Sequence, residues 1–180
     1  HFISNSPWDS EGLMLELAKN VARKLQPYGK IGCTVDEKAH LKKGTKSVGV
    51  ARQYAGTSGK VDNCQVAVYL SLTAGKYSSL TNFRLFLPQQ WIDNPKRCQK
   101  AGIPESKIVF KTKPQLGLDM IREHIDHGVH FDYVNGDGLY GNGFEFSKGL
   151  ASLGVNYVLE THCDQLIFTQ EPRISVPVAE

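Results

Sequence analysis

The order of strand and helix patterns along the chain constrains its fold most. In the first half, segments of β-type sequence follow one another and are separated by glycine-containing turns. In the second half, helical and strand patterns alternate. This order predicts an α/β fold with one mixed sheet and flanking helices. The five strands expected in this sheet are residues 31–35, 64–74, 81–87, 130–136 and 155–160.

Three segments have the apolar spacing of amphipathic helices. They cover residues 11–26, 114–127 and 144–153. The buried face expected for the first helix consists of apolar residues four apart: Leu13, Leu17, Val21 and Leu25. Asp9 or Ser10 is a suitable N-cap for that helix. A further β-type segment, residues 47–55, precedes the second strand of the sheet.

Length and composition predict a single domain over residues 1–180. The chain is 41% hydrophobic, which is enough for one core but short for two. We expect an N-terminal helical segment (1–29), a sheet core (30–163) and a tail (164–180). The longest apolar runs are only a few residues, so neither a transmembrane helix nor a signal peptide is expected. The four cysteines form no Cys-x-x-Cys pair, which favours reduced thiols in a cytosolic protein over a zinc site.

The net charge of +3 conceals an uneven distribution. Residues 1–118 carry 18 Lys and Arg against 8 Asp and Glu, whereas residues 119–180 carry 3 against 10. Within residues 38–60 there is no acid, and the basic residues are Lys38, Lys42, Lys43, Lys46, Arg52 and Lys60. Such a stretch suits a nucleic-acid backbone, because neutralised phosphates release counterions. A solvated basic loop is the alternative.

Two carboxylates occupy matching positions. Asp36 directly follows the strand 31–35, and Asp137 directly follows the strand 130–136. If these strands are neighbours, the two acids meet at the same edge of the sheet. Carboxylate oxygens are the ligands that Mg²⁺ prefers, so the pair predicts a metal site. The alternative is that each Asp is a turn residue or a helix cap.

The same region also matches a second motif. Gly136, Gly138 and Gly141 fit the Gly-x-Gly-x-x-Gly pattern of dinucleotide-binding folds, after a strand and before a helix. However, Asp137 places a negative charge inside the turn that would hold phosphate. The preceding antiparallel strands also do not fit a doubly wound sheet. A dinucleotide site is therefore the minor alternative.

Histidine and tryptophan residues give weaker signals. His124 and His127 are three residues apart on one predicted helix, which suits either a metal site or, more commonly, a polar helix face. Trp8 and Trp91 each lie close before an aspartate, and we interpret them as anchors of the core or of the sheet edge.

Several longer motifs resemble one family along almost the whole chain. They are HFISNSPWD (1–9), KKGTKSVGVARQYAGTSGKVDNCQVAV (42–68), RLFLP (84–88), KTKPQLGL (111–118) and DGLYG (137–141). In this order, they resemble bacterial insertion-sequence transposases of the DDE superfamily-endonuclease group. The middle stretch is the longest and most specific of these motifs.

The resemblance implies an RNase H-like catalytic domain in which three acids surround two Mg²⁺ or Mn²⁺ ions. Asp36 matches the first acid and Asp137 the second. The third is a Glu on a helix well downstream, and neither Glu171 nor Glu180 has its surroundings. We therefore expect an internal portion of a transposase that lacks the final catalytic helix and cuts DNA poorly alone.

The resemblance also implies the partners and the reaction. The expected reaction is metal-dependent cleavage at transposon ends followed by strand transfer into target DNA, with a homodimer in the full-length protein. It would take place in the bacterial cytoplasm, at the nucleoid. The residues expected to contact DNA phosphates are Lys42, Lys43, Lys46, Arg52 and Lys60. A non-catalytic DNA-binding remnant is the main alternative.

Overall fold

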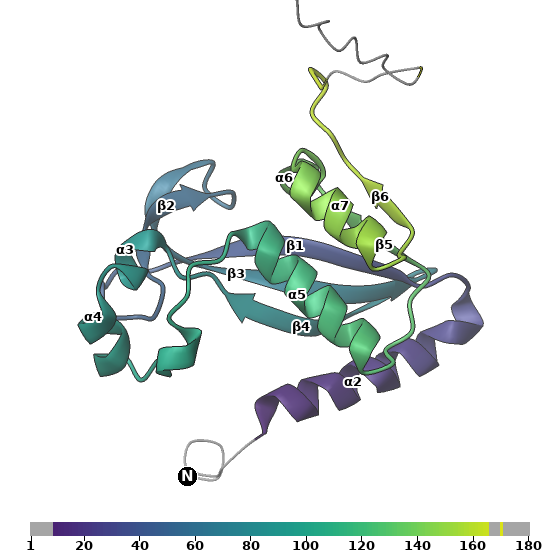
Figure 1. Cartoon of the computed structure of the whole chain (residues 1–180), viewed down its shortest axis with the longest axis horizontal. Coiled ribbons are helices and arrows are strands. Elements are labelled where there is room, and N and C mark those ends of the chain that lie inside the picture. Colours follow the sequence, from purple (N-terminus) through teal and green to yellow (C-terminus); the bar gives the residue numbers. More distant parts are fainter. Residues whose placement is uncertain (1–8, 166–169, 171–180) are drawn as a thin grey trace, which may run out of the picture.

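The elements of the chain follow the predicted order (Figure 1). The computed structural model describes residues 9–165 and 170. In its first half the elements are α2 (Ser10–Leu25), η1 (Gln26–Tyr28), β1 (Gly32–Leu41), β2 (Ala51–Ala55), β3 (Lys60–Ala74) and β4 (Tyr77–Leu85). Three short helices follow, which are α3 (Gln89–Ile92), α4 (Pro95–Lys100) and η2 (Glu105–Lys107). The last elements are α5 (Lys113–Asp126), β5 (Tyr133–Gly136), α6 (Gly138–Gly141), α7 (Phe144–Ser152) and β6 (Tyr157–Leu159).

The strands form one mixed sheet, which confirms the RNase H-like α/β fold. Its order is β2-β3-β1-β5-β6, and β4 also pairs with β3. The pairs β1–β3, β2–β3 and β3–β4 are antiparallel, whereas β1–β5 and β5–β6 are parallel. The sheet has six strands rather than the expected five. The sixth is β2, which pairs with the first residues of the long strand β3.

One face of the sheet carries the main core. Pairing places Val35 opposite Leu70, and their side chains are buried together with Val134 of β5. Helices α2, α5 and α7 contribute to this same cluster. The side chains that alternate with these, including Asp36, belong to the opposite face.

Helix α2 begins after the expected N-cap Asp9, but its buried face differs from the prediction. Leu13 and Leu17 are 58% and 41% exposed. The buried residues are Leu15, Ala18, Ala22 and the predicted Leu25, and the predicted Val21 is partly buried against the same core. Residues four apart drift around a helix by about 40° at each step, because a turn takes about 3.6 residues. Residues spaced alternately three and four positions apart stay on one face of the helix. Leu15, Ala18, Ala22 and Leu25 have this spacing.

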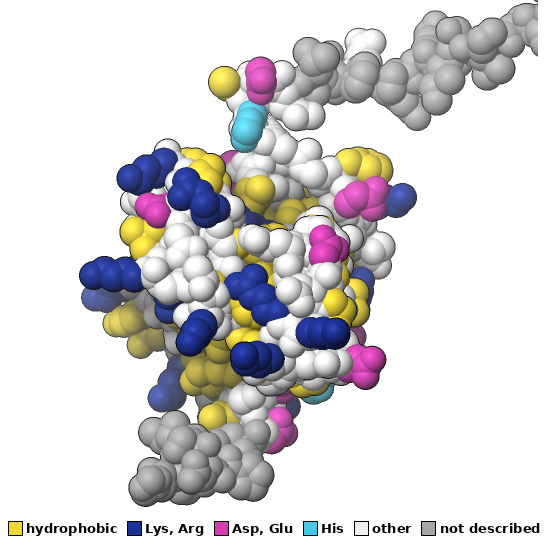
Figure 2. All heavy atoms as spheres, turned by 90° about the vertical axis from the view of Figure 1, so that its left-hand side faces the viewer, with side chains coloured by type: hydrophobic (Ala, Val, Ile, Leu, Met, Phe, Trp, Pro, Cys, Tyr) yellow, Lys and Arg dark blue, Asp and Glu magenta, His cyan; other side chains and the backbone are white. Residues whose placement is uncertain are grey.

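A second, smaller core fills one end of the sheet. Trp91 of α3 and Cys98 of α4 are buried against Val50, and the Trp91 indole N–H donates to the Val50 carbonyl at 2.9 Å. Trp91 is thus the anchor that the sequence predicts, whereas Trp8 lies outside the described residues. Seen from this end, the surface shows many Lys and Arg side chains and few acids (Figure 2).

The Glu37 carboxylate joins β1 to two helices. Lys113, at the start of α5, lies 3.0 Å from Glu37 Oε1, and both side chains are about one-fifth exposed. The Tyr140 hydroxyl of α6 donates to Glu37 Oε2 at 3.0 Å. Burial, followed by the charge of Glu37, raises the pKa of Tyr140, so this hydroxyl remains a donor. Glu37 therefore fixes α5 and α6 relative to the strand that carries Asp36.

Two glycines allow the chain to pack closely around Val35. A Cβ atom on Gly117 of α5 or on Gly136 of β5 would lie 2.9 Å from a Val35 methyl group. Real Cβ contacts are not this short. Both glycines are therefore required for α5 and α6 to approach β1 at this point.

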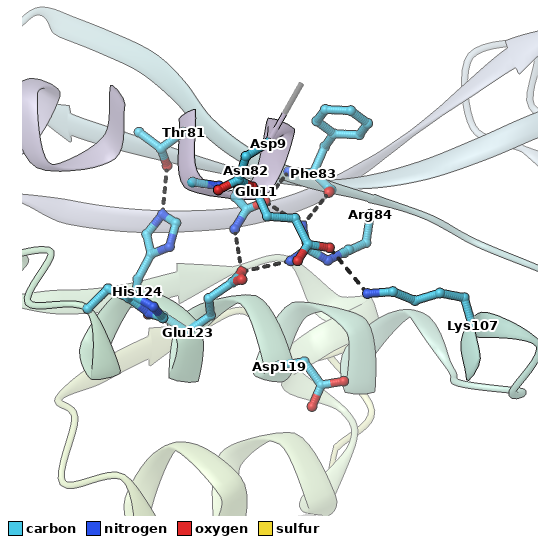
Figure 3. Close-up of polar contacts among 12 residues, drawn as sticks. Asp9, Glu11, Thr81, Asn82, Phe83, Arg84, Lys107, Asp119, Glu123 and His124 are labelled. Atoms are coloured by element: carbon cyan, nitrogen blue, oxygen red, sulfur yellow. Dashed lines mark hydrogen bonds and ion pairs between the residues drawn. The ribbon is translucent and has the colours of Figure 1, made fainter. Parts of the chain in front are cut away.

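The histidine of α5 lies in the core rather than on a polar face (Figure 3). His124 is fully buried, and its Nε2 lies 3.2 Å from the Thr81 hydroxyl of β4. That hydroxyl is also 3.4 Å from the Leu70 carbonyl, to which it donates. Nδ1 has no hydrogen-bond partner among the described residues. Burial lowers the pKa of His124 to about 4, so the ring is neutral in the folded protein. The polar-face interpretation is wrong for His124, because its spacing from Met120 and Ile121 puts it on the buried side.

The described residues contain neither a membrane-spanning helix nor a disulfide. No helix in residues 9–165 is long and apolar enough to cross a bilayer. All four cysteines are free thiols, and Cys163 alone is exposed. Most of the predicted tail, including Glu171 and Glu180, lies outside the described residues.

The first prediction concerns Glu37. We expect Glu37→Ala to lower the free energy of unfolding by about 1–3 kcal/mol, because Lys113 and Tyr140 lose their shared acceptor in a partly buried site. Urea denaturation measures this change. The matched control is Glu16→Ala, which breaks an exposed ion pair with Lys19 and should cost less than about 0.5 kcal/mol. Equal effects of the two variants would contradict the role of Glu37.

The second prediction concerns the pH dependence of stability. The pKa of His124 is lower in the folded chain than its ordinary value of 6.5, so the unfolded chain takes up the proton first as pH falls. Stability is therefore lost between about pH 6.5 and pH 4, by about 2 kcal/mol at about pH 5. We expect His124→Gln to reduce the loss between about pH 7.5 and pH 5 by this amount, as measured by urea denaturation. In the control His130→Gln, which changes an exposed histidine, the loss should match that of the wild type.

Candidate metal centre

The parallel pairing of β1 and β5 brings Asp36 and Asp137 together. Val35 and Gly136 are paired across the two strands, and the two aspartates are the next residues on each chain. Adjacent strands are about 4.8 Å apart, so the backbones that carry the two side chains are neighbours. The condition on which the metal site depends, that the two strands are adjacent, is therefore met.

The two aspartates have different local settings. Asp36 lies inside β1, because the strand continues to Leu41 instead of ending at Val35 as predicted. Beyond Asp36, Ala39 is buried opposite Val66, and this apolar pair keeps the strand in register with β3. Asp137 begins α6 as its N-cap, so the cap interpretation of this residue is correct and is compatible with a metal site.

Each carboxylate uses one oxygen in a local hydrogen bond. Asp36 Oδ1 accepts from the Glu37 N–H at 2.7 Å, and Asp137 Oδ1 accepts from the Leu139 N–H at 3.0 Å. For both residues, Oδ2 accepts no hydrogen bond within the described part of the chain. These bonds fix the orientation of each carboxylate and leave one oxygen available to a ligand.

The electrostatics of the pair favour a cation. Burial raises the pKa of Asp36, and the negative charge of Asp137 raises it further. The Glu37 N–H and Lys38 act in the opposite direction but do not reverse the shift. A cation between the carboxylates would remove this repulsion, and oxygen donors of this kind suit Mg²⁺ or Mn²⁺.

The described residues do not supply a third ligand. No group of three or more His, Cys, Asp and Glu residues in this part of the chain is arranged to hold a metal ion. Glu160 follows β6 and is exposed, without belonging to such a group. A metal held by Asp36 and Asp137 alone would keep most of its water ligands.

The glycines around Asp137 serve close packing. Gly136 lies against Val35, and a side chain on Gly141 would collide with the carbonyl of Glu160. Helix α6 contains only four residues. A dinucleotide fingerprint requires a longer helix whose N-terminus faces the pyrophosphate, so the geometry does not favour that alternative.

The predicted DNA-contacting residues separate into two groups. Lys46 and Arg52 line one hollow at the end of the sheet where α3 and α4 lie. Lys42 and Lys43 belong to the loop after β1, and Lys60 begins β3; none of the three lines that hollow.

Sequence reasoning missed the side chains that support these sites. Glu37, Lys113 and Tyr140 come from three separate segments, and no local spacing connects them. Arg97 and Lys100 of α4 line the same hollow as Lys46. The available signal for them was a basic run, PKRCQK, directly after the N-cap Asn94.

Comparison with known proteins gives the family. A family model described as DDE superfamily endonuclease matches residues 1–180. The chain is 35% identical over 163 residues to a probable transposase for insertion sequence element IS701 from Microchaete diplosiphon. This match covers 88% of the chain but only 39% of the relative. No solved structure gives a significant match. The protein therefore belongs to the DDE superfamily of endonucleases.

Proposed function

We propose that this chain is part of the catalytic core of an insertion-sequence transposase. The transposase would cleave phosphodiester bonds at the transposon ends and join these ends to target DNA. The observation that carries the proposal is the pairing of Asp36 and Asp137 on adjacent parallel strands. The similarity to the probable transposase supports the same reaction. Because the match spans 39% of that relative, the activity of the whole protein is part of the proposal.

In this proposal, Asp36 and Asp137 hold the catalytic metal, Mg²⁺ or Mn²⁺ in a two-metal arrangement. The Oδ2 atom of each aspartate would be free to bind the metal, while the Oδ1 atoms accept backbone hydrogen bonds that keep each side chain oriented. When bound, the metals would supply an activated water and stabilise the leaving oxygen. The protein itself contributes the orientation of the carboxylates and their negative charge.

Double-stranded DNA is the proposed partner, as transposon ends and as target. The cations proposed to contact its phosphates are Lys42, Lys43, Lys46, Arg52 and Lys60. These contacts fix the position of a duplex but carry little sequence information. A homodimer of the full-length protein, acting at the nucleoid in the cytoplasm, completes the proposal.

A non-catalytic DNA-binding remnant is the second candidate. The observation that favours it is that the acid pair has no third ligand among the described residues. The two candidates differ in metal binding and in cleavage.

The third prediction concerns the metal. We expect Mn²⁺ to bind weakly to the chain, and Asp36→Asn or Asp137→Asn to weaken binding at least about tenfold, because each removes one of two charged ligands. Isothermal titration calorimetry measures the affinity. Asn is as good an N-cap as Asp, so Asp137→Asn should preserve α6. The control Asp126→Asn changes an exposed acid of α5 and should bind Mn²⁺ like the wild type. Unchanged binding in both site variants would contradict the metal centre.

The fourth prediction concerns cleavage. With Mn²⁺, we expect the 180-residue chain to nick supercoiled plasmid only slowly, since both metals must be held in line with the scissile phosphate. Asp36→Asn and Asp137→Asn should remove this residual nicking, as measured on agarose gels. Robust nicking that Asp137→Asn abolishes would show that a third acid, such as Glu160, Glu171 or Glu180, acts within this chain. Nicking that survives in both variants would rule out the acid pair as the catalytic site.

A further inference from the structure

A hollow of about 660 Å³ lies between the loop after β1, the start of β2 and helices α3 and α4. Four of its lining side chains are cationic: Lys46, Arg52, Arg97 and Lys100. None of its lining residues is acidic. A water takes up about 30 Å³ in the liquid, so the hollow is large enough to admit a phosphodiester with its hydration. It lies at the basic end of the molecule seen in Figure 2.

The charges of this hollow are not compensated within the described part of the chain. None of its four cations takes part in an ion pair there. Six other cations do so, namely Lys19, Arg84, Lys107, Lys111, Lys113 and Arg122. Four positive charges around one concave surface attract a polyanion and raise its local concentration.

The walls of the hollow are held in place before any ligand arrives. The Arg97 guanidinium lies over the ring of Trp91, at 3.8 Å from its centroid, and donates to the Thr45 carbonyl at 2.8 Å. Trp91 is itself buried and hydrogen-bonded to Val50. The indole ring is therefore covered and is not available for stacking with a base. A fixed guanidinium loses less conformational freedom on binding, which favours affinity.

The loop that carries Lys46 is anchored in a similar way. The Asn63 amide donates to the carbonyls of Lys42 and Gly44 at 2.6 and 3.0 Å. The Gln65 amide donates to the carbonyl of Val48 at 2.7 Å. These contacts to β3 distinguish the segment from a freely solvated basic loop.

The strand register relates the hollow to the acid pair. Asp36 and Leu41 are separated along β1 by about 17 Å at the usual rise of a strand. Leu41 pairs with Cys64, which pairs in turn with Ala51 at the hollow, about 10 Å to the side. The hollow is therefore about 20 Å from Asp36, which corresponds to about six base pairs of duplex.

Two residues of the hollow, Arg52 and Asn63, belong to the same face of the sheet as Asp36. Asp36 is paired with Tyr69 of β3, and Arg52 is paired with Asn63. Tyr69 and Asn63 are an even number of residues apart on the same strand, so their side chains belong to one face. A duplex lying across that face can reach both sites.

We propose that this hollow is a phosphate-binding subsite that holds the backbone of duplex DNA about six base pairs from the cleavage point. This inference rests on the proposed function and adds Arg97 and Lys100 to the DNA-contacting residues. The subsite positions the duplex relative to Asp36 and Asp137 without reading its sequence.

The test uses the double variant Lys46→Ala/Lys100→Ala, which leaves the Arg97–Trp91 stack intact. The control Lys24→Ala/Lys96→Ala removes the same charge from exposed positions outside the hollow, and Lys96 lies on the same helix α4. Binding to a duplex of about 30 base pairs is measured by fluorescence anisotropy over a series of salt concentrations. We expect the slope of log K against log salt to fall by about 2 in the hollow variant, at about 0.9 for each lost phosphate contact, and not in the control.

The possible outcomes separate this inference from the function on which it rests. If the wild type binds the duplex and both double variants bind alike, the hollow is not the subsite, whereas DNA binding by the chain stands. If the wild type binds no duplex at any salt concentration, the proposed function fails and the inference fails with it. Tighter binding to single-stranded RNA or to polyglutamate than to the duplex would also overturn the assignment. Mn²⁺ binding at the acid pair should be unchanged in the hollow variant.

Discussion

The parallel pairing of β1 and β5 is the constraint on which the candidate metal centre depends. Val35 of β1 fits between Gly117 of α5 and Gly136 of β5, and a Cβ atom on either glycine would collide with it. Next to Val35, the Glu37 carboxylate contacts both Lys113 and Tyr140 and so joins β1 to α5 and α6. The side chain of Glu37 belongs to the core face and that of Asp36 to the opposite face, because successive residues of a strand alternate. One strand segment therefore both stabilises the fold and presents the acid.

The acid pair itself does not stabilise the fold. Burial is the main cause of the raised pKa of Asp36, and the negative charge of Asp137 raises it further, so the two carboxylates repel each other. The interactions that keep them together are the capping bond from Leu139 N–H to Asp137, the bond from Glu37 N–H to Asp36, and the packing around Val35. A rigid framework that holds like charges together is expected where a cation is the intended ligand.

The sequence allowed the main sheet and the acid pair to be predicted, because both depend on local patterns. Short runs of β-type sequence located the strands, and each aspartate comes directly after such a run. The extension of β1 was not predictable, since its apolar signal after Asp36 is little more than Ala39, which pairs with Val66 of a distant strand. The exposure of Leu13 and the burial of His124 were not predictable either, because they depend on which side of each helix packs against the sheet. The cationic hollow joins residues from five segments, so only the folded chain reveals it.

The hollow and the acid pair are built on different cores, and this separation has a physical consequence. Arg97 and Lys100 rest on the small core around Trp91 and Cys98, in a connection between β4 and α5. Their mutual repulsion therefore acts on that connection rather than on the strands that align Asp36 with Asp137. At the same time, β1 and β3 run without interruption from the acids to the edge of the hollow. A duplex held at the hollow would thus be positioned by the rigid sheet relative to the acid pair. The cations can be concentrated at the hollow without disturbing the geometry of the acids.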